Sequence, residues 1–439
     1  MAPVITPDST RIETLGPATR PSPLPLDIAP STGQARFVAE AARVRYQAEL
    51  QTGADLPDDV FFEKAGPREK LFFDPRKTRA AIVTCGGLCP GLNNVIRSAF
   101  LELHHNYGVP EIWGIRYGYA GLNPAVGEPP LRLTGQLVDN IHEEGGTILG
   151  TSRGPQPTEV MVDFLAEHDI NILLCVGGDG TLRGAGDIAR EAQRRKLPVA
   201  VVGVPKTIDN DVKYIARTFG LSTATEKARE VLDCAHNEAR SVFNGVGLVK
   251  VMGRDAGFIA AFATLASQEV NFTLIPEVPL RLEGDHGFLE VLRRRIATRH
   301  HAVVVVAEGV GQDLLAGDTQ LRDASGNQRL ADIGPFLKAQ IAAHCRQAQT
   351  PVEIKYFDPS YIVRSVPANT SDALLCDQLA RNAVHAAMAG KTNLVVGLWN
   401  EHLTHVPIPL AVQAKKQVDP TSALWKSVLA ATGQPSTWQ

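Results

Sequence analysis

The sequence has few of the features that mark secreted, membrane-bound or disulfide-stabilised proteins. Its six cysteines are scattered through 439 residues, and several of them lie within apolar runs. This pattern favours reduced thiols in a cytosolic compartment over a disulfide framework. No uninterrupted apolar stretch is long enough to cross a membrane, and residues 1–30 contain no apolar core of a signal peptide. We therefore expect a cytoplasmic protein with no membrane partner.

The composition also lacks a strong charge of either sign. The formal net charge is −3, so we expect no nucleic-acid partner. Small phosphorylated ligands are compatible with this charge, because they require only a local cluster of arginine and lysine side chains. With 44% apolar and 21% charged residues, the chain is an ordinary globular sequence that is long enough for two domains.

From residue 78 onward, short runs rich in valine, isoleucine and leucine alternate with longer amphipathic stretches. This alternation predicts parallel sheets covered by helices. The expected strands are 80–84, 112–115, 170–176, 197–202, 246–252 and 301–307, and a helix is expected over 92–105. Residues 1 to about 35 are rich in proline, serine and threonine and are expected to form a mobile extension, whereas Gly33 to Leu50 carries a helical pattern. The regular core is expected to begin near Thr78.

Glycines and acids gather where four of these strands end. The first strand is followed by CGGLCPG at 85–91, the third by GGDGT at 177–181, the fourth by PKTIDND at 205–211 and the last by Glu308-Gly309. In open α/β sheets, ligands bind outside the carboxyl ends of the strands. The sequence therefore predicts a site formed by these four segments.

The segment 205–211 places a lysine beside two carboxylates. Lys206 can bind phosphate oxygens, while Asp209 or Asp211 can take a proton from a hydroxyl or hold a metal ion, as phosphoryl transfer requires. Aspartate and asparagine also populate turns by hydrogen-bonding their own backbone. For this segment taken alone, both explanations stay open.

Two glycine-rich segments are suited to binding phosphate. Gly86 and Gly87 precede the helix expected over 92–105, where a backbone without side chains can approach an anion, although glycine pairs also serve tight turns. The segment 145–154 ends in Arg153 and Gly154, and arginine grips phosphate oxygens in a fork. A surface loop with an incidental arginine is the alternative for this second segment.

The third glycine-rich segment, 177–181, is more specific. Asp179 at the tip of a buried strand can reach a magnesium ion, and glycine at position 180 leaves a space that any side chain would fill. Lipid kinases of the diacylglycerol type and NAD kinases resemble this short motif too, so it indicates a phosphoryl-donor site without naming an acceptor. The nearby Cys85 and Cys89 have no second pair with metal-ligand spacing and are interpreted as structural thiols.

The acceptor is indicated by two segments together. The segment 205–211 combined with VMGRDAGF at 251–258 resembles the 6-phosphofructokinase family, over roughly residues 78 to 400 and with the motifs in the family's order. Tyr361 to Arg364, following the strand end at Glu308, fits as well. The resemblance implies phosphorylation of fructose 6-phosphate at its C1 hydroxyl to give fructose 1,6-bisphosphate, with magnesium as cofactor.

The resemblance also implies the architecture. It predicts an α/β protein with two Rossmann-like three-layer domains, mostly parallel sheets and an active-site cleft between them that closes on binding. The expected domains are a phosphoryl-donor domain over 78–220 and 363–413 and a sugar-phosphate domain over 221–362, with an N-terminal extension over 1–77 and a C-terminal tail over 414–439.

Roles are implied for the residues that match the family's motifs. Asp209 is the expected general base, Asp211 its supporting carboxylate and Asp179 the magnesium ligand. The expected contacts to the donor come from Gly87, Arg153, Gly154, Gly178, Asp179, Gly180 and Thr181, and the expected catalytic group also includes Lys206, Thr207 and Arg254. The expected contacts to the sugar phosphate come from Thr207, Ile208, Asp209, Met252, Gly253, Arg254, Glu308, Lys355, Tyr361 and Arg364.

Two positions point to opposite phosphoryl donors. Lys206 stands where the well-known bacterial ATP enzymes have glycine, and it is shared with pyrophosphate-dependent members. Gly180 stands where pyrophosphate enzymes typically carry an aspartate, which would crowd and repel the α-phosphate of a nucleotide. We give Gly180 more weight, because excluding ATP requires filling that space, whereas a lysine can serve either donor. The combination resembles the ATP-dependent long subgroup that includes plant and trypanosomatid enzymes.

A further departure concerns the interface between subunits. Bacterial members place at position 245 an arginine that reaches the sugar phosphate of a neighbouring subunit, whereas this chain has Gly245. Asn244 and Arg240 are candidates to replace it, and Lys355 occupies another position that in the family crosses the subunit boundary. The resemblance implies a homodimer or homotetramer with a shared sugar site. A catalytically silent sugar-phosphate sensor is the rival from another class, and the presence of both Asp209 and Asp179 speaks against it.

Overall fold

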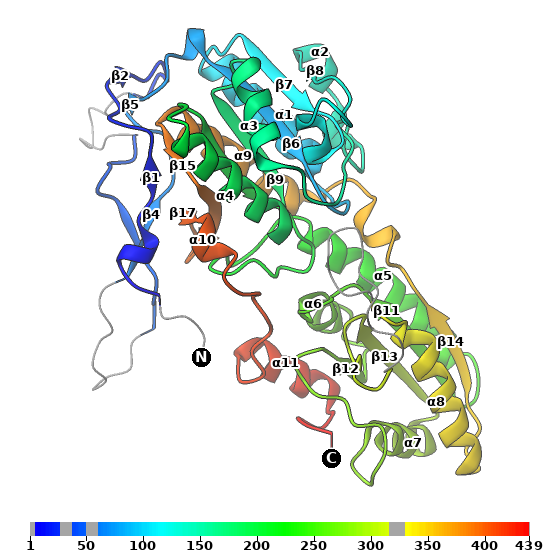
Figure 1. Cartoon of the computed structure of the whole chain (residues 1–439). Helices are drawn as coiled ribbons and strands as arrows, with labels where there is room; N and C mark the ends of the chain where they lie inside the picture. Colours follow the sequence, from blue (N-terminus) through cyan, green and yellow to red (C-terminus); the bar gives the residue numbers. More distant parts are fainter. Residues whose placement is uncertain (1–4, 27–36, 50–59, 316–329, 439) are drawn as a thin grey trace. The chain divides into compact units, whose positions relative to one another are not determined.

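The computed structural model describes residues 5–26, 37–49, 60–315 and 330–438, which form two compact units (Figure 1). Unit 1 consists of Met1–Thr207, Val212–Gly220 and Val366–Ala414, and unit 2 of Ile208–Asp211, Leu221–Ser365 and Lys415–Gln439. The chain passes between the two units several times, so each unit is assembled from segments that lie far apart in the sequence.

Unit 1 is built on a nine-stranded mixed sheet. In spatial order its strands are β3 (Arg43–Arg45), β4 (Phe61–Lys64), β17 (His402–Pro407), β16 (Leu394–Trp399), β10 (Ala200–Pro205), β9 (Ile172–Gly177), β6 (Arg79–Thr84), β7 (Glu111–Ile115) and β8 (Leu131–Arg132). The central strands from β16 to β7 run parallel, and the outer strands are antiparallel. Two short antiparallel pairs join β1 (Glu13–Thr14) to β15 (Lys391–Thr392) and β2 (Arg20–Pro21) to β5 (Lys70–Leu71).

Helices form two layers on this sheet. Helix α1 packs on α9, which also contacts β9, β10 and β16, and α3 packs on α4, which contacts β9 and β10 (Figure 1). The helices of unit 1 are α1 (Leu92–Leu101), α2 (Gly135–Val138), α3 (Thr158–Glu167), α4 (Asp179–Arg194), α9 (Thr370–Met388) and α10 (Ile408–Ala411).

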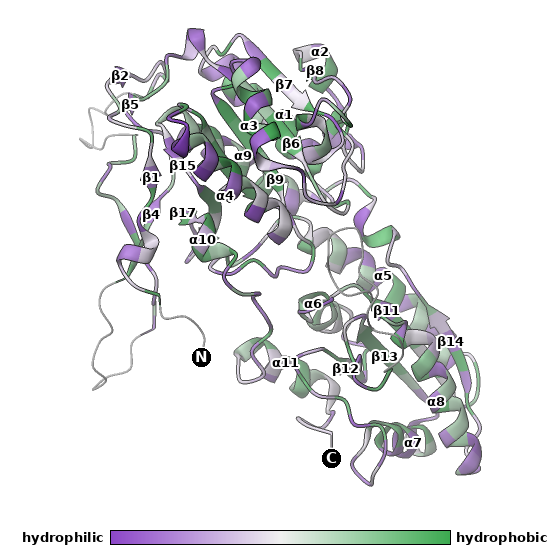
Figure 2. Cartoon of the chain, viewed as in Figure 1, coloured by the Kyte–Doolittle hydropathy of each residue, from purple (hydrophilic) through white to green (hydrophobic). Residues whose placement is uncertain are grey.

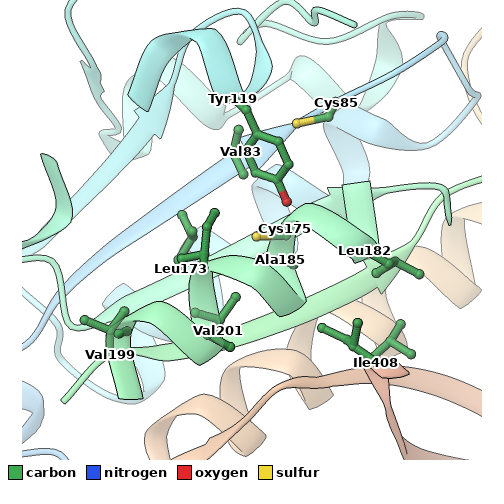
Figure 3. Close-up of a cluster of buried hydrophobic side chains, with 14 of the residues drawn as sticks. Val83, Cys85, Tyr119, Leu173, Cys175, Leu182, Ala185, Val199, Val201 and Ile408 are labelled. Carbon is green, nitrogen blue, oxygen red and sulfur yellow. The ribbon is translucent and has the colours of Figure 1, made fainter. Parts of the chain in front are cut away.

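The core beneath α4 brings together side chains from the sheet and the helix (Figure 3). Its labelled members include Val83, Cys85, Tyr119, Leu173, Cys175, Leu182, Ala185, Val199, Val201 and Ile408. Burial raises the pKa of Cys85 to about 12, so this thiol stays neutral at physiological pH. The interpretation of Cys85 as a structural thiol is consistent with this environment, because a buried neutral thiol is neither a nucleophile nor a metal ligand.

Unit 2 is built on a four-stranded, fully parallel sheet. Its strands in spatial order are β12 (Phe272–Leu274), β13 (His301–Ala307), β11 (Gly245–Val251) and β14 (Glu353–Phe357). Its helices are α5 (Leu221–Arg240), α6 (Phe258–Ser267), α7 (Phe288–Arg299), α8 (Ile333–Gln347) and α11 (Ala423–Thr432). Helices α5 and α6 pack on each other and on the sheet, and so do α7 and α8.

The hydropathy of the strands explains this layering. Strands β9 and β13 are hydrophobic along their length (Figure 2), and both faces of each are buried. A strand that is apolar on both faces requires cover on both sides, which parallel α/β sheets provide. The expected α/β class with mostly parallel sheets is therefore confirmed. Among the helices in the described part of the chain, none is both long and apolar enough to cross a membrane.

The residues before Thr78 contribute strands, so the expectation that the regular core begins there was wrong. Of the stretch with a helical pattern, 37–49 lie among the described residues, and they hold strand β3 rather than a helix. Val44 is buried between two arginines, which is the alternation of a strand. The ring of Tyr46 stacks on Trp399 at 5.4 Å, which ties this segment to the main sheet.

The residues after Ala414 also differ from expectation. Residues 415–439 belong to unit 2 instead of forming a separate tail. Their helix α11 contacts α6 and β12 and buries Trp425. The side chain of Gln434 accepts a hydrogen bond from the backbone N–H of Thr273 (2.6 Å) and donates to its carbonyl oxygen (3.1 Å). Segment 208–211, which was expected in the donor domain, also groups with unit 2.

Candidate active site

Three of the segments predicted to form the site meet in unit 1, where β6, β9 and β10 end. The backbone N–H of Gly86 donates to the carbonyl oxygen of Ser152 (3.0 Å), and Thr151 Oγ1 donates to the carbonyl oxygen of Gly86 (2.6 Å). The backbone N–H of Lys206 donates to the carbonyl oxygen of Gly177 (3.0 Å). The two glycine-rich loops that follow β6 and β9 and the loop at 145–154 are thus part of one hydrogen-bonded framework.

Lys206 brings a positive charge into this framework. Its side chain is buried, and Nζ donates to the carbonyl oxygen of Gly87 at 2.7 Å. A Cβ atom built at Gly86 would lie 3.3 Å from Lys206 Nζ, and the φ of Gly86 is +85°, which side chains rarely adopt. Glycine at position 86 therefore leaves the room in which the ammonium group lies.

The N-terminus of α4 follows directly from the glycines after β9. Gly178 is the N-cap residue, and Asp179, Gly180 and Thr181 form the first turn of the helix. The buried hydroxyl of Tyr119 donates to the carbonyl oxygen of Thr181 at 2.6 Å and holds this turn from beneath (Figure 3). The exposed backbone N–H groups and the dipole of such a turn favour an anion, so the geometry suits a phosphate group.

Gly180 faces open space. A Cβ atom built at this position would meet nothing within 4 Å. The φ of Gly180 is also not in the positive range that only glycine adopts readily. Neither packing nor backbone conformation therefore requires glycine here.

Arg153 is exposed in the neighbouring loop, and Gly154 has a φ of +101°.

Asp179 is the carboxylate available to a magnesium ion. Its two oxygens accept hydrogen bonds from Arg183, with Nε at 3.0 Å and Nη2 at 3.4 Å. Within the described ranges no cluster of three or more His, Cys, Asp or Glu side chains could hold a metal ion. One partly exposed carboxylate fits magnesium, which binds through one or two carboxylates together with substrate phosphates.

In unit 2, the loop 208–211 carries the two carboxylates of the motif. Burial raises the pKa of Asp209 to about 8, and the charges of Asp211 and Glu308 add to this rise. The ammonium of Lys415 and the backbone N–H of Arg254 act in the opposite direction. Asp209 is therefore a carboxyl group whose proton affinity is matched to neutral pH, as a general base requires.

The ends of β11 and β13 meet beside this loop. The backbone N–H of Glu308 donates to the carbonyl oxygen of Val251 (2.9 Å), and that of Gly309 donates to the carbonyl oxygen of Gly253 (3.1 Å). A Cβ atom at Gly309 would lie only 1.8 Å from the carbonyl oxygen of Arg254. Glycine at position 309 is therefore needed for the close approach that places Glu308 beside Arg254.

Glu308 lies among several charges. Burial raises the pKa of this carboxyl group, and the positive charges of Arg254, Lys250 and Arg364 oppose that rise. Met252 follows β11 directly and is partly buried. Residues from three separate parts of the sequence thus surround a single carboxylate in unit 2.

Tyr361 and Arg364 form a pair at the surface of unit 2. The guanidinium carbon of Arg364 lies 5.0 Å from the centroid of the Tyr361 ring, and the tyrosine is 74% exposed. Arg364 reaches the Glu308 group electrostatically. A cation stacked on an exposed aromatic ring leaves its remaining N–H donors available for an anion.

Comparison with known proteins identifies this arrangement. The profile of the phosphofructokinase family matches residues 79–387, which is well over half of the chain. An ATP-dependent 6-phosphofructokinase of Borreliella burgdorferi is 46% identical over 433 residues, covering 97% of this chain and 96% of the relative. This chain belongs to the phosphofructokinase family.

Other members show similar likeness. An ATP-dependent 6-phosphofructokinase of Amycolatopsis methanolica is 44% identical over 439 residues (98% of this chain and 95% of the relative). A chloroplastic ATP-dependent enzyme of Arabidopsis thaliana is 45% identical over 399 residues (89% and 74%), which supports the expected resemblance to plant enzymes.

The fold is shared with solved phosphofructokinases. A pyrophosphate-dependent phosphofructokinase from Nitrosospira multiformis matches with a TM-score of 0.67 at 17% identity, covering 82% of this chain and 93% of that chain. One from Marinobacter aquaeolei matches with a TM-score of 0.66 at 19% identity, covering 82% and 92%. At this identity the likeness concerns the fold alone.

Within this phosphofructokinase, the predicted site residues fall into two groups. In unit 1 the structure brings together Gly87, Arg153, Gly154, Gly178, Asp179, Gly180, Thr181, Lys206 and Thr207. In unit 2 it brings together Ile208, Asp209, Asp211, Met252, Gly253, Arg254, Glu308, Tyr361 and Arg364. The boundary between the units falls between Thr207 and Ile208, inside the motif.

Lys355 does not join the unit 2 group. It lies on the edge strand β14, opposite Gly247 of β11. Gly247 is four residues before Val251, where β11 ends. Its Nζ atom pairs with Glu353 at 2.7 Å. A contact of Lys355 with the sugar phosphate of a neighbouring subunit stays a prediction.

The glycine at position 245 has a packing explanation. A Cβ atom there would lie 2.0 Å from the carbonyl oxygen of Ala239, so β11 can pack beneath the end of α5 only with glycine. Asn244, proposed as a substitute for the missing arginine, instead has its side chain in structural hydrogen bonds to Pro351 (3.2 Å) and His300 (3.2 Å). Arg240, which is exposed at the end of α5, is the better placed of these two candidates.

Sequence reasoning missed three residues at the site. Lys415 pairs with Asp211, and Lys416 is partly buried with a pKa that burial lowers to about 7. Glu277 accepts hydrogen bonds from the backbone N–H groups of Gly257 and Val418. No spacing pattern marks these residues, and the apolar periodicity of 423–432 was the only signal that the C-terminal segment belongs to the fold.

Proposed function

We propose that this chain transfers the γ-phosphoryl group of ATP to the C1 hydroxyl of fructose 6-phosphate, giving fructose 1,6-bisphosphate in glycolysis. The observation that carries the proposal is the environment of Asp209. This carboxyl group is buried beside Asp211 and Glu308, and it accepts a hydrogen bond from the backbone N–H of Arg254. Its pKa of about 8 suits the removal of a hydroxyl proton as the phosphoryl group arrives.

The donor binds through the framework of unit 1 in this proposal. The turn from Gly178 to Thr181 receives phosphate oxygens at the N-terminus of α4, and Arg153 grips them from the neighbouring loop. Lys206 and Thr207 lie next to the transferring group. A loose transition state spreads negative charge over the phosphoryl oxygens, so fixed cations and backbone N–H groups lower its energy.

The acceptor binds through unit 2. Met252, Gly253 and Glu308 contact the sugar, while Tyr361 and Arg364 hold its 6-phosphate. Arg254 is placed to neutralise charge that develops during transfer, since it lies beside both Asp209 and Glu308. Asp211 supports Asp209 by holding negative charge beside it, which keeps its proton affinity high.

Magnesium is the expected cofactor, and Asp179 would hold it together with phosphate oxygens of the nucleotide. When bound there, the ion neutralises charge on the phosphates. Arg183 now hydrogen-bonds both oxygens of Asp179, and magnesium held there would compete with this ion pair. The ion pair is of the (i, i+4) type on a partly exposed helix face, so its loss costs little, on the order of 0.5 kcal/mol.

ATP is the donor that Gly180 favours. The open space at this position accommodates a nucleotide phosphate that an aspartate would repel. Pyrophosphate stays as the second candidate because of Lys206, which presents its charge within the glycine-rich framework. The deciding experiment compares initial rates with ATP and with pyrophosphate at equal concentrations of fructose 6-phosphate and magnesium. A rate seen only with pyrophosphate would overturn the choice of ATP.

We also propose a homodimer or homotetramer in which a neighbouring subunit completes the sugar site. The exposed Tyr361 and Arg240 and the half-buried Lys355 support this proposal, because each leaves a polar or aromatic group for a second copy to contact. Light scattering of the purified chain at assay concentration tests it, and a monomeric active enzyme would exclude it.

The proposed location is the cytoplasm, which the buried thiols support.

A further inference from the structure

A short C-terminal segment reaches both loops of the acceptor site. The segment 415–418 follows the last residue of unit 1 and lies beyond the part of the chain that the family profile matches, which ends at residue 387. Among its contacts are some with the 208–211 loop, some with the loop before α6 and one with Glu277. These partners belong to unit 2.

Two contacts join the segment to Asp211. Lys415 Nζ lies 2.5 Å from Asp211 Oδ2, and the backbone N–H of Lys416 donates to the carbonyl oxygen of Asp211 (2.9 Å). The aspartate side chain is 10% exposed, whereas that of Lys415 is 37% exposed. The segment thus fixes both the backbone and the carboxylate of Asp211, which lies two residues after Asp209.

Two further contacts join the segment to the loop before α6. Gln417 Nε2 donates to the carbonyl oxygen of Asp255 (2.9 Å), and the backbone N–H of Val418 donates to Glu277 Oε1 (2.7 Å). The same Glu277 carboxylate accepts from the backbone N–H of Gly257, at 3.0 and 3.2 Å. Glu277 therefore clamps the C-terminal segment onto the loop that carries Arg254.

The charges around Asp209 show what Lys415 does there. Asp211 in the same loop and Glu308 after β13 both disfavour a negative charge on Asp209, whereas the ammonium of Lys415 favours one. Lys416 adds a second positive charge, which acts on Asp211. Removing Lys415 would take a positive charge away from Asp209 while the two carboxylates stay beside it, which should raise its proton affinity further.

We propose that Lys415 is a positioning residue that fixes the Asp211 carboxylate and lowers the proton affinity of the base Asp209, and that residues 415–418 deliver it to the site. This inference rests on the proposed function, because it assigns Lys415 a part in the same proton transfer. It differs from a purely structural role because the ionisation of Asp209 should then change when the charge of Lys415 is removed.

The first experiment measures kcat/KM against pH for the wild type, Lys415→Met, Lys415→Arg and Lys426→Met. Lys426 is exposed on α11 in the same C-terminal segment and is the matched control. Lys415→Met should move the acid limb of the profile to higher pH by about one pH unit. At pH values below the limb, kcat/KM should therefore fall roughly tenfold. Its activity should recover at alkaline pH, and Lys415→Arg should keep the limb of the wild type.

An unmoved limb in Lys415→Met, or a loss of kcat that is equal at every pH, would overturn the inference. Lys415→Gln repeats the test if the methionine variant fails to fold. If the wild type is active and the acid limb does not move in either Lys415→Met or Lys415→Gln, only the role of Lys415 is refuted. A wild type that transfers phosphate from neither donor refutes the proposed function instead.

A second measurement is independent of turnover. The difference in apparent Tm between the wild type and Lys415→Met should widen as the pH rises from 5 to 9, because Asp209 then ionises without the nearby ammonium of Lys415. Lys426→Met should show no such trend. A difference that is flat with pH would overturn the inference whether or not the enzyme is active.

Discussion

Lys206 Nζ donates to the carbonyl oxygen of Gly87 at 2.7 Å, so the end of β10 holds the first glycine-rich loop through a buried cation. Two segments that lie far apart in the sequence are joined by one side chain. The contact gives Lys206 a structural task in addition to the phosphate contact that its motif implies.

Lys206→Met should test how these two tasks divide. The methionine keeps the length of the side chain and removes its charge, so we expect kcat to fall by roughly 10²–10³-fold with either donor. The apparent Tm should fall as well, because the carbonyl oxygen of Gly87 loses its buried donor. Lys338→Met, on the exposed face of α8, is the control. A variant with normal kcat and a lowered Tm would assign Lys206 a structural task alone.

Gly180→Asp should fold normally and lose the use of ATP. The new side chain enters open space, and its charge lies against the nucleotide phosphates, so kcat/KM for ATP should fall on the order of 10²-fold or more. Gly180→Ala separates size from charge and should retain most of the activity. If both variants use ATP as the wild type does, position 180 does not discriminate between donors.

Asp209→Asn should abolish most of the turnover while leaving sugar binding nearly intact. The amide keeps the acceptor for the backbone N–H of Arg254 but cannot take a proton, so kcat should fall about 10²–10⁴-fold. The KM for fructose 6-phosphate should change by less than about threefold. Asp285→Asn, at an exposed position, controls for the loss of one charge. A turnover equal to that of the wild type would remove Asp209 from the role of base.

The raised pKa of Asp209 also predicts how stability depends on pH. Between the ordinary aspartate value of 3.8 and about 8, the folded chain holds a proton that the unfolded chain has released. The stability from this group is complete below that window and is lost as the pH rises through about 8. Asp209→Asn does not titrate, so its Tm relative to the wild type should increase from pH 5 to pH 9. A Tm difference between Asp209→Asn and the wild type that stays constant with pH would contradict the claim that Asp209 is buried and holds a proton in the folded chain.

Gly245→Arg should destabilise the fold instead of restoring the arginine of the bacterial enzymes. A side chain at this position meets the carbonyl oxygen of Ala239 at 2.0 Å, and such overpacking costs about 1–3 kcal/mol. Thermal unfolding should show a lower Tm and no gain in affinity for fructose 6-phosphate. Arg240→Ala, at the exposed end of the same helix, should leave the Tm within error. A stable variant with tighter sugar binding would refute the packing explanation.

Much of the fold was visible in local patterns. Strand β13 occupies the predicted range from His301 to Ala307, because burial on both faces leaves a direct trace in the sequence. Strand β10 begins at Ala200 instead of Leu197, since Lys196 takes a positive φ of 58° in the preceding turn. Periodicity carries no information about such a turn.

The misassigned ends of the chain have a common cause. Strand β3 is three residues long, and its partners β4 and β17 come from distant parts of the sequence, so no window of neighbouring residues reveals it. The contacts of Lys415 likewise join residues about 200 positions apart. Pairing over such distances is decided by tertiary packing, which local propensity does not encode.

The sequence by itself determined the chemistry. The spacing of Lys206, Asp209 and Asp211 and the glycines after the strands specify a phosphoryl-transfer site, because these side chains keep their chemical nature in any fold. Tertiary structure decided their environment: Asp209 acquires its raised pKa only when burial and Glu308 are brought to it. It also decided that Lys415 balances that charge, because proton affinity depends on distances in space, and these are set only when the chain has folded.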